Sequence, residues 1–308
     1  MPSGAFNKVI SFVLKPLKNI TDEAINAVTL DDLTMADKWI VAKANQLVRD
    51  VTDNMEKFEL GVAADKIHNF LWDEFCDWYI EMVKPRLWDD NDTTKAAALW
   101  TLREVLSIGL KLLHPYMPFV TEEIYCTLTD DESIMIAPWP VAEESRDFAL
   151  EAKNVDIIKD AVRAIRTVRT DMNVPPSRKA AVYVVSDKED IRKVFEDSSS
   201  FFGTLGYASE VKVQADKTGI DDDAVSAVIH NAVIYIPFAE LVDVEKELER
   251  LNKEKARLEG EIKRGEGMLS NPNFVEKAPE AKVNAEKEKL AKYKETYEQV
   301  LERIGALK

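Results

Sequence analysis

Two runs of heptad spacing near the C-terminus constrain the fold of this 308-residue chain more than any other feature. Apolar side chains recur in both runs at alternating intervals of three and four residues, first at Leu241, Val244, Leu248, Leu251, Leu258 and Ile262, and then at Val283, Leu290, Tyr293, Tyr297, Val300 and Ile304. Between the runs, Pro272 and Pro279 interrupt any helix. The pattern is typical of coiled coils, and the runs are short, so we expect the chain to fold back as an antiparallel hairpin with residues 267–283 at its tip.

Charges beside the apolar seam favour pairing of the two runs with each other. The flanking positions of the first run carry Glu245, Glu247, Glu254, Glu259 and Glu261, and those of the second carry Lys282, Lys287, Lys289, Lys294 and Arg303. The predicted register places Leu241 opposite Val300, Val244 opposite Tyr297, Leu248 opposite Tyr293, Leu251 opposite Leu290, Leu258 opposite Val283 and Lys255 opposite Glu286. At about 1.5 Å per residue, such an arm would extend roughly 35 Å.

A basic stripe lies on the side of the first run that faces away from the seam. It consists of Lys246, Arg250, Lys253, Arg257 and Arg264. Two interpretations stay open, because most charges on coiled coils form a solvated face, whereas a row of this kind can also follow the phosphates of a nucleic acid.

The first 140 residues predict a helical bundle. Apolar residues recur at helical spacing over residues 5–19, 37–56 and 60–84, with Pro85 expected to end the third helix. A further helix is expected from Thr93 or Thr94 to Pro115, and another from Pro118 to about Leu128. We therefore expect an up-and-down bundle over residues 1–140.

Residues 141–240 change in character. A helix is expected over 146–171, followed by β-like runs at 180–185, 210–215 and 227–238, the last turning at His230 and Asn231. The segment 187–197 between the strands has helical spacing. These residues predict a small α+β module, and the arm follows over 241–308. The expected fold class is mainly α, with a helical bundle, a small α+β module and a coiled-coil hairpin.

Composition excludes several functional classes. The net charge of −15 is uneven, since residues 1–140 hold 13 Lys and Arg against 23 Asp and Glu, whereas residues 241–308 hold 15 of each. So acidic a chain is a poor nonspecific nucleic-acid binder, and RNA contact would need local basic patches. Two distant cysteines and three scattered histidines give no disulfide framework and no metal-ligand spacing. No membrane helix or signal peptide is visible, which indicates a cytoplasmic protein without membrane contact.

Three stretches resemble the valyl-tRNA synthetase family. Residues 37–87 are similar to the anticodon-binding bundle of synthetases for branched aliphatic amino acids, "LLHPYMPFVTEEIY" closes that bundle, and residues 247–283 are similar to the C-terminal arm of the valine enzymes. The class I signatures for adenylate formation, of the HIGH and KMSKS types, are missing from these residues. The resemblance implies the tRNA-binding portion of such an enzyme, monomeric and inactive alone, without a cofactor of its own, because ATP and Mg²⁺ belong to the catalytic domain. The expected partner is tRNA specific for valine.

The resemblance implies anticodon reading by the bundle and contact of the arm with the outer corner of the tRNA. Candidate contacts outside the arm lie at helix ends and on one arginine-rich helix: Lys38, Trp39, Lys43, Lys84, Arg86, Arg163, Arg166, Arg169, Arg178 and Lys179. Each has a structural alternative, such as packing of the Trp-rich segment in the core or salt bridges across a domain junction. The alternatives for the whole chain are a coiled-coil protein-interaction adaptor and the equivalent portion of an isoleucyl-type synthetase.

Overall fold

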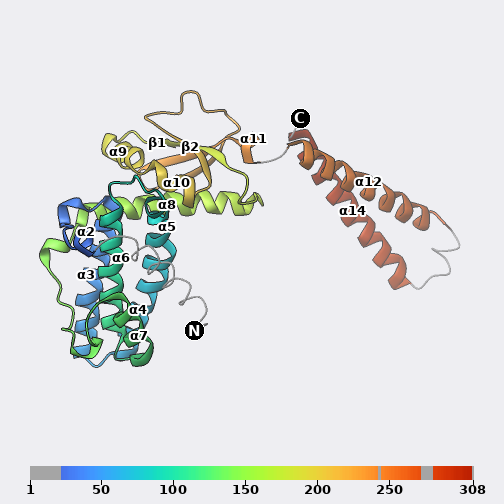
Figure 1. The fold of residues 1–308 in the computed structure, drawn as a ribbon. Coiled ribbons are helices and arrows are strands. Elements are labelled where there is room, and N and C mark those ends of the chain that lie inside the picture. The colour runs from blue at the N-terminus through green and yellow to red at the C-terminus, as the bar shows by residue number, and fades with distance from the viewer. Residues whose placement is uncertain (1–21, 242–243, 272–279, 307–308) are drawn as a thin grey trace.

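The computed structural model describes residues 22–241, 244–271 and 280–306 (Figure 1). The helix predicted over 5–19 and residues 272–279 of the predicted arm tip lie outside these residues. Within them the chain is mainly helical, with one four-stranded sheet and a C-terminal helix pair, as the sequence predicts. No helix in these described ranges is long and apolar enough to cross a membrane.

The bundle consists of helices that alternate in direction around one apolar core (Figure 1). After the short α2 (Asp22–Asn26) and η1 (Leu30–Asp32), its elements are α3 (Met35–Glu56), α4 (Leu60–Asn69), the π-helical η2 (Phe70–Tyr79), α5 (Ile80–Trp88), α6 (Lys95–Leu113) and α7 (Pro118–Leu128). Thr34 starts α3 with a capping box, since its backbone N–H donates to the carboxylate of Asp37 over 2.9 Å. Thr94 precedes α6 and Pro118 opens α7, at the positions predicted.

The prediction that Pro85 ends its helix is wrong. The chain runs helically from Leu60 to Trp88, and Pro85 lies inside α5. The next two residues explain this, because Leu87 is buried in the core and Arg86 forms an ion pair with a buried carboxylate. Tertiary contacts therefore outweigh the loss of one helical hydrogen bond at proline.

The α+β module begins with the long helix α8 (Ala149–Asp171), which packs along α3 of the bundle. The sheet has the strand order β2-β1-β4-β3, with β1 (Ala180–Val185) parallel to β2 (Ala208–Gln214) and antiparallel to β4 (Ala232–Ile236). The hairpin of β3 (Val225–Ile229) and β4 turns at Asn231, which has φ of 66°, a left-handed value that asparagine tolerates.

Helix α9 (Glu189–Asp197) was expected, whereas α10 (Ser199–Leu205) was not. Short turns η3 (Ile134–Ile136) and η4 (Glu144–Arg146) connect bundle and module, which share one continuous core.

The C-terminal helix pair consists of α12 (Val244–Leu269) and α14 (Glu280–Ala306), which lie side by side away from the bundle (Figure 1). Leu251 and Leu258 are buried together with Val300 and Ile304, and Tyr293 and Tyr297 pack against them. Across the pair, the Tyr297 hydroxyl donates to Glu259 over 2.7 Å. The two helices are therefore antiparallel and joined through the predicted apolar seam.

The predicted register of this pair is wrong by two heptads. Tyr297 lies at the level of Leu258 and Glu259 and not of Val244, and Leu290 faces Gly265 and not Leu251. Leu241 ends the short α11 (Phe238–Leu241) and is buried in the core of the module, so it does not face Val300. A slip of whole heptads keeps every apolar residue on the seam, so the heptad pattern alone could not distinguish the two registers.

The polar layer predicted between Lys255 and Glu286 is absent as well. Each of these residues lies near a charged neighbour on its own helix, Lys255 near Glu259 and Glu286 near Lys289, with 3.9 Å between charged atoms in both pairs. The predicted attraction between flanking positions does occur once among the described residues, where the Lys294 ammonium lies 2.7 Å from the Glu266 carboxylate.

Cysteine crosslinking distinguishes the two registers. We expect Leu258→Cys combined with Tyr297→Cys to be joined by a short thiol crosslinker, because these positions meet across the seam. Leu258→Cys combined with Val283→Cys, the predicted partner, should stay unlinked, because Val283 lies fourteen residues, or about 21 Å, farther along α14. With a crosslinker that contains a disulfide, gel mobility before and after reduction shows which pair is linked, and preferential linkage of the second pair would contradict the observed register.

Candidate RNA-binding surfaces

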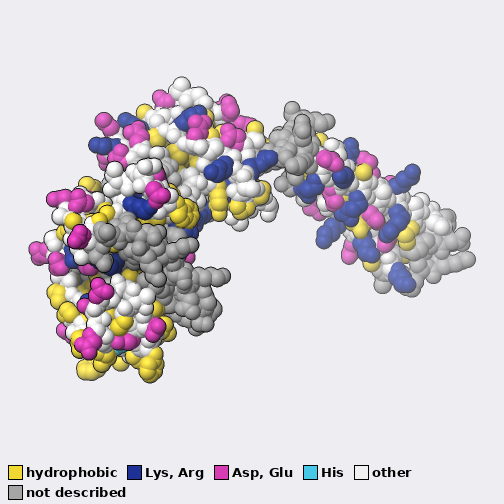
Figure 2. Space-filling model, in the orientation of Figure 1, with side chains coloured by type: hydrophobic (Ala, Val, Ile, Leu, Met, Phe, Trp, Pro, Cys, Tyr) yellow, Lys and Arg dark blue, Asp and Glu magenta, His cyan; other side chains and the backbone are white. Residues whose placement is uncertain are grey.

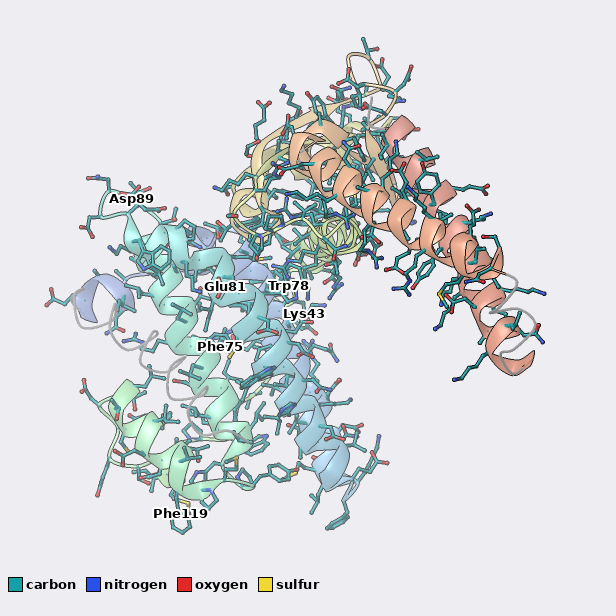
Figure 3. All side chains as sticks on the ribbon, turned by 90° about the vertical axis from the view of Figure 1, so that its right-hand side faces the viewer. Lys43, Phe75, Trp78, Glu81, Asp89 and Phe119 are labelled. Carbon is teal, nitrogen blue, oxygen red and sulfur yellow. The ribbon has the colours of Figure 1, made fainter. Side chains whose placement is uncertain are left out.

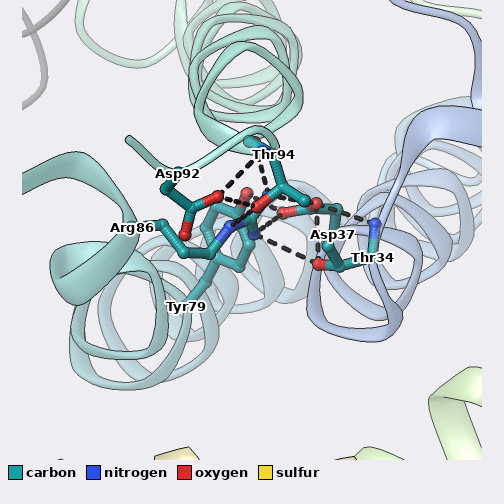
Figure 4. Close-up of polar contacts among 6 residues, drawn as sticks. All are labelled: Thr34, Asp37, Tyr79, Arg86, Asp92 and Thr94. Atoms are coloured by element: carbon teal, nitrogen blue, oxygen red, sulfur yellow. Dashed lines mark hydrogen bonds and ion pairs between the residues drawn. The ribbon is translucent and has the colours of Figure 1, made fainter. Parts of the chain in front are cut away.

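Arg86, a predicted RNA contact, belongs to a buried ion network at the start of the bundle (Figure 4). Its guanidinium donates two bonds to the Asp37 carboxylate over 2.8 and 2.9 Å, and the Tyr79 hydroxyl donates a third over 2.7 Å. The remaining N–H groups of Arg86 donate to the Thr34 hydroxyl and to the hydroxyl and carbonyl of Thr94. All five donors of the guanidinium are thereby engaged within the bundle, which favours a structural role for Arg86, and its contact with RNA stays a prediction.

Burial shifts the ionisation of this network. Loss of solvation raises the pKa of Tyr79 well above its usual value, with the neighbouring Asp37 charge acting in the same direction. The pKa of Arg86 is raised, because hydrogen bonds and charge attraction from Asp37 outweigh its loss of solvation. The network thus holds a half-buried cation, Arg86, against a fully buried anion, Asp37, in fixed geometry, and it ties α3, α5 and the start of α6 together.

Trp39 is also structural. Its side chain is 0% exposed, and it lies in the core where α3 meets α8. The Lys159 ammonium of α8 lies 4.9 Å from the Trp39 ring and 5.2 Å from the Trp78 ring, and it forms an ion pair with Glu74. Burial lowers the pKa of Lys159 despite that carboxylate. Its indole therefore belongs to a cation–π cluster that joins bundle and module, which favours the structural alternative, and contact of Trp39 with RNA stays a prediction.

Two of the three predicted arginines of α8 share an exposed face. The guanidinium groups of Arg163 and Arg166 lie 5.4 and 5.5 Å from the Trp78 ring, on its side toward α8. Arg163 also pairs with Asp160, and Arg166 donates to the Leu205 carbonyl over 2.9 Å. Both side chains remain exposed to solvent, so the structure brings together two cations beside an aromatic ring.

Arg169, the third of these arginines, has a buried side chain and not an exposed one. Its guanidinium donates to the carbonyls of Pro175 and Arg178 and lies over the Tyr207 ring. It therefore fixes the turn before β1, which favours a structural role for Arg169, and its contact with RNA stays a prediction. Arg178 on the same turn is half-buried, while Lys179 is exposed.

Lys38 and Lys43 of α3 both pair with carboxylates of α8, and Lys43 lies near Trp78 (Figure 3). Lys38 lies 3.7 Å from Glu151 and Lys43 lies 3.2 Å from Asp156, both on α8. Lys84 pairs with Glu81 on its own helix. The first two lysines are partly exposed and thus remain candidates for contact with a ligand at the edge of α8.

The basic stripe of the arm is exposed on α12 (Figure 2). Lys253, Arg257 and Arg264 each pair with a glutamate three or four residues earlier, namely Glu249, Glu254 and Glu261. Arg250 is exposed as well, whereas the side chain of Lys246 lies outside those described. Exposed pairs of this kind contribute less than about 1 kcal/mol, so a phosphate can replace the glutamate as partner.

Sequence reasoning missed Lys159 and Asp37. Lys159 interrupts the apolar stripe of α8 between Val155 and Val162, and this interruption was the available signal for a buried cation. Asp37 stands three residues after Thr34, where a capping box was readable, but nothing in the sequence identified Arg86 as its partner. Within the described ranges, no cluster of His, Cys, Asp and Glu could hold a metal ion.

Two family models match the chain, one for each part of this arrangement. Residues 37–184 match the anticodon-binding domain of tRNA ligases, and residues 243–308 match the tRNA-binding arm of valyl-tRNA synthetases. The first match covers the bundle from α3 onward, α8 and most of β1, and the second covers the helix pair.

Curated relatives agree with these matches. The chain is 50% identical over 277 residues to a valine–tRNA ligase of Clostridium perfringens and 52% identical over 279 residues to that of Clostridium tetani, with 90% of this chain covered in each case. A valine–tRNA ligase of Carboxydothermus hydrogenoformans is 38% identical over 300 residues. The chain spans about a third of the length of these relatives, 31% for the first two and 33% for the third.

Proposed function

We propose that this chain, which is homologous to valine–tRNA ligases over nine-tenths of its length, is the tRNA-binding portion of such an enzyme. The bundle would read the anticodon, and the arm would bind the body of the tRNA. One observation carries this proposal: models of an anticodon-binding domain and of a valyl-specific arm match consecutive parts of one chain, over folds that fit both descriptions. The match to the valyl arm favours valine over the isoleucine alternative.

The charges of the bundle and of the arm support different modes of RNA contact for the two parts. The acidic bundle is poorly suited to attract phosphates, so it would recognise unstacked bases through short-range contacts. The candidate place is the edge of α8, where Arg163 and Arg166 lie against Trp78 of η2 and where Lys38 and Lys43 of α3 pair with carboxylates of α8. The arm has no net charge and an exposed basic stripe, so it would follow the sugar–phosphate backbone.

The remaining assignments follow from this proposal. We assign residues 1–140 to the anticodon-binding bundle, 141–240 to a connecting module and 241–308 to the arm. The whole enzyme would be a class I aminoacyl-tRNA synthetase of the cytoplasm, and this portion would bind tRNA as a monomer. Amino-acid activation with ATP and Mg²⁺ is not assigned to these residues, because they carry neither signature of that chemistry.

Charge reversal on the arm tests the proposal. We expect Arg250→Glu, Lys253→Glu and Arg257→Glu together to weaken binding of valine tRNA by at least roughly a hundredfold at low salt. Each phosphate contact that is lost should also flatten the plot of log K against log salt by about 0.9. Filter binding at several salt concentrations measures both quantities.

A matched control separates the stripe from total charge. Lys193→Glu, Lys212→Glu and Lys217→Glu change the net charge equally at exposed positions of the module, far along the chain from α12. The control variant should retain most of the affinity and the original salt slope. If the arm variant also retained both, the stripe would be only a solvated face.

A further inference from the structure

One end of the bundle exposes an unusual number of large apolar side chains. They lie in the turn between α3 and α4 and at the start of α4, in the turn between α6 and α7 and at the start of α7, and in η3. We call this surface the end patch: Phe58, Leu60, Met117, Phe119, Met135 and Ile136. Phe119 is 91% exposed and points away from the bundle, at the end where hydrophobic side chains gather (Figures 2 and 3). Contiguous apolar patches on soluble domains mark interaction sites.

Hydrogen bonds between the three segments fix the end patch in place. The Tyr116 hydroxyl donates to the Leu60 carbonyl over 2.8 Å, which joins the two turns. His114 lies 2.9 Å from the Met135 sulfur, which joins η3 to the end of α6. Phe58 has φ of 59°, a left-handed value that is strained for a phenylalanine, and its side chain is 87% exposed. The surface is therefore preformed, and a strained residue exposes an aromatic ring on it.

Charges around the end patch argue against RNA as its occupant. The nearest exposed charges in the sequence are mostly acidic: Glu56, Glu59, Glu123, Asp131 and Glu132. Lys57, in the same turn, forms an ion pair with Asp53 over 2.6 Å. An acidic rim repels phosphates, whereas an apolar centre with a polar rim is the usual anatomy of a protein interface.

The comparisons indicate which protein surface fits. The relatives are about three times as long as the matched region, so in each of them roughly two-thirds of the sequence must connect to a portion like this one. We propose that the end patch docks against that remaining portion of the ligase, through an apolar surface bordered by basic residues. This inference rests on the proposed function, but it concerns a surface that does not bind tRNA.

Site-specific photo-crosslinking in a full-length chimera tests the proposal. The chimera carries these 308 residues in place of the matched region of the Clostridium perfringens ligase, with p-benzoyl-phenylalanine in place of Phe119. Because Phe119 is almost fully exposed, the replacement should not disturb folding of the bundle. We expect crosslinks to peptides of the ligase outside the 308 residues. The same probe in place of Val228, which is also exposed but lies on β3, should give none there.

A second variant tests the apolar contact itself. With the photo-probe in place of Leu60, which is 47% exposed and takes part in the end-patch hydrogen bonds only through its backbone carbonyl, Phe119→Ser combined with Ile136→Ser should lower the crosslink yield by roughly tenfold, because central apolar side chains dominate such interfaces. Val228→Ser combined with Leu150→Ser, at exposed apolar positions elsewhere, should leave the yield unchanged. In the isolated chain neither pair should shift the unfolding midpoint.

Several outcomes would overturn the proposal. They are crosslinks only within the 308 residues, crosslinks between two copies, crosslinks to added tRNA, and a yield unaffected by the paired serine substitutions. The arm variant with three glutamates should crosslink normally in the chimera. Loss of tRNA binding and loss of docking are therefore observed separately, and either proposal can fail while the other stands.

Discussion

Replacing Asp37 by alanine should lower the free energy of unfolding of the bundle by about 3–5 kcal/mol. The carboxylate is completely buried and is the only anion within hydrogen-bond distance of the Arg86 guanidinium in the described part of the chain. Its removal leaves the half-buried Arg86 cation with hydroxyl and carbonyl partners alone, and the Tyr79 hydroxyl without its acceptor. Urea unfolding followed by circular dichroism measures the loss.

A triple variant shows whether this cost arises from an uncompensated charge. Asp37→Leu, Arg86→Met and Tyr79→Phe together remove the ions and their hydroxyl partner while keeping apolar volume. We expect this variant to be more stable than Asp37→Ala, because replacing a whole buried ion pair is much less costly than breaking one. A triple variant less stable than the single one would show that the network stabilises the bundle through geometry that apolar side chains cannot supply.

The sequence predicted most helices and strands because their apolar periodicity was regular. Strand β1 was placed at its observed residues, and the hairpin turned where expected at Asn231. Helix α10 was missed because it is only seven residues long, which is too short for a repeating apolar pattern. The helix through Pro85 was missed because the compensating partner of Arg86 lies forty-nine residues away in sequence.

The candidate site was less predictable because exposure of its residues depends on contacts between segments that are distant in sequence. Arg163, Arg166 and Arg169 have equal spacing in sequence, yet only the first two are exposed, because α8 packs between the bundle and the sheet and buries the third. The arm illustrates a second limit. Heptad periodicity defines which residues face the partner helix but not their level along it, and in a hairpin the level depends on where the turn lies. The heptad pattern alone therefore could not distinguish registers of α12 and α14 that differ by whole heptads.

Trp39→Ala should destabilise the chain by about 3–5 kcal/mol, as expected for a fully buried large aromatic residue. The indole fills the contact between α3 and α8 and provides one of the two rings beside the Lys159 ammonium. Its removal leaves a cavity and withdraws one cation–π partner from a buried lysine. The unfolding midpoint in urea, compared with that of the unmodified chain, measures this loss.

Two companion variants separate structure from RNA contact. Trp39→Phe should cost much less than Trp39→Ala, because it keeps a ring and because the buried Nε1 of Trp39 has no hydrogen-bond acceptor among the described residues. Lys38→Ala, at the neighbouring partly exposed position, should leave the unfolding midpoint nearly unchanged, so any weakening of tRNA binding there reflects a lost contact. If Trp39→Ala weakened tRNA binding without any shift in unfolding, the indole would have to leave the core when RNA binds, and the junction of α3 and α8 would be an opening surface and not a fixed one.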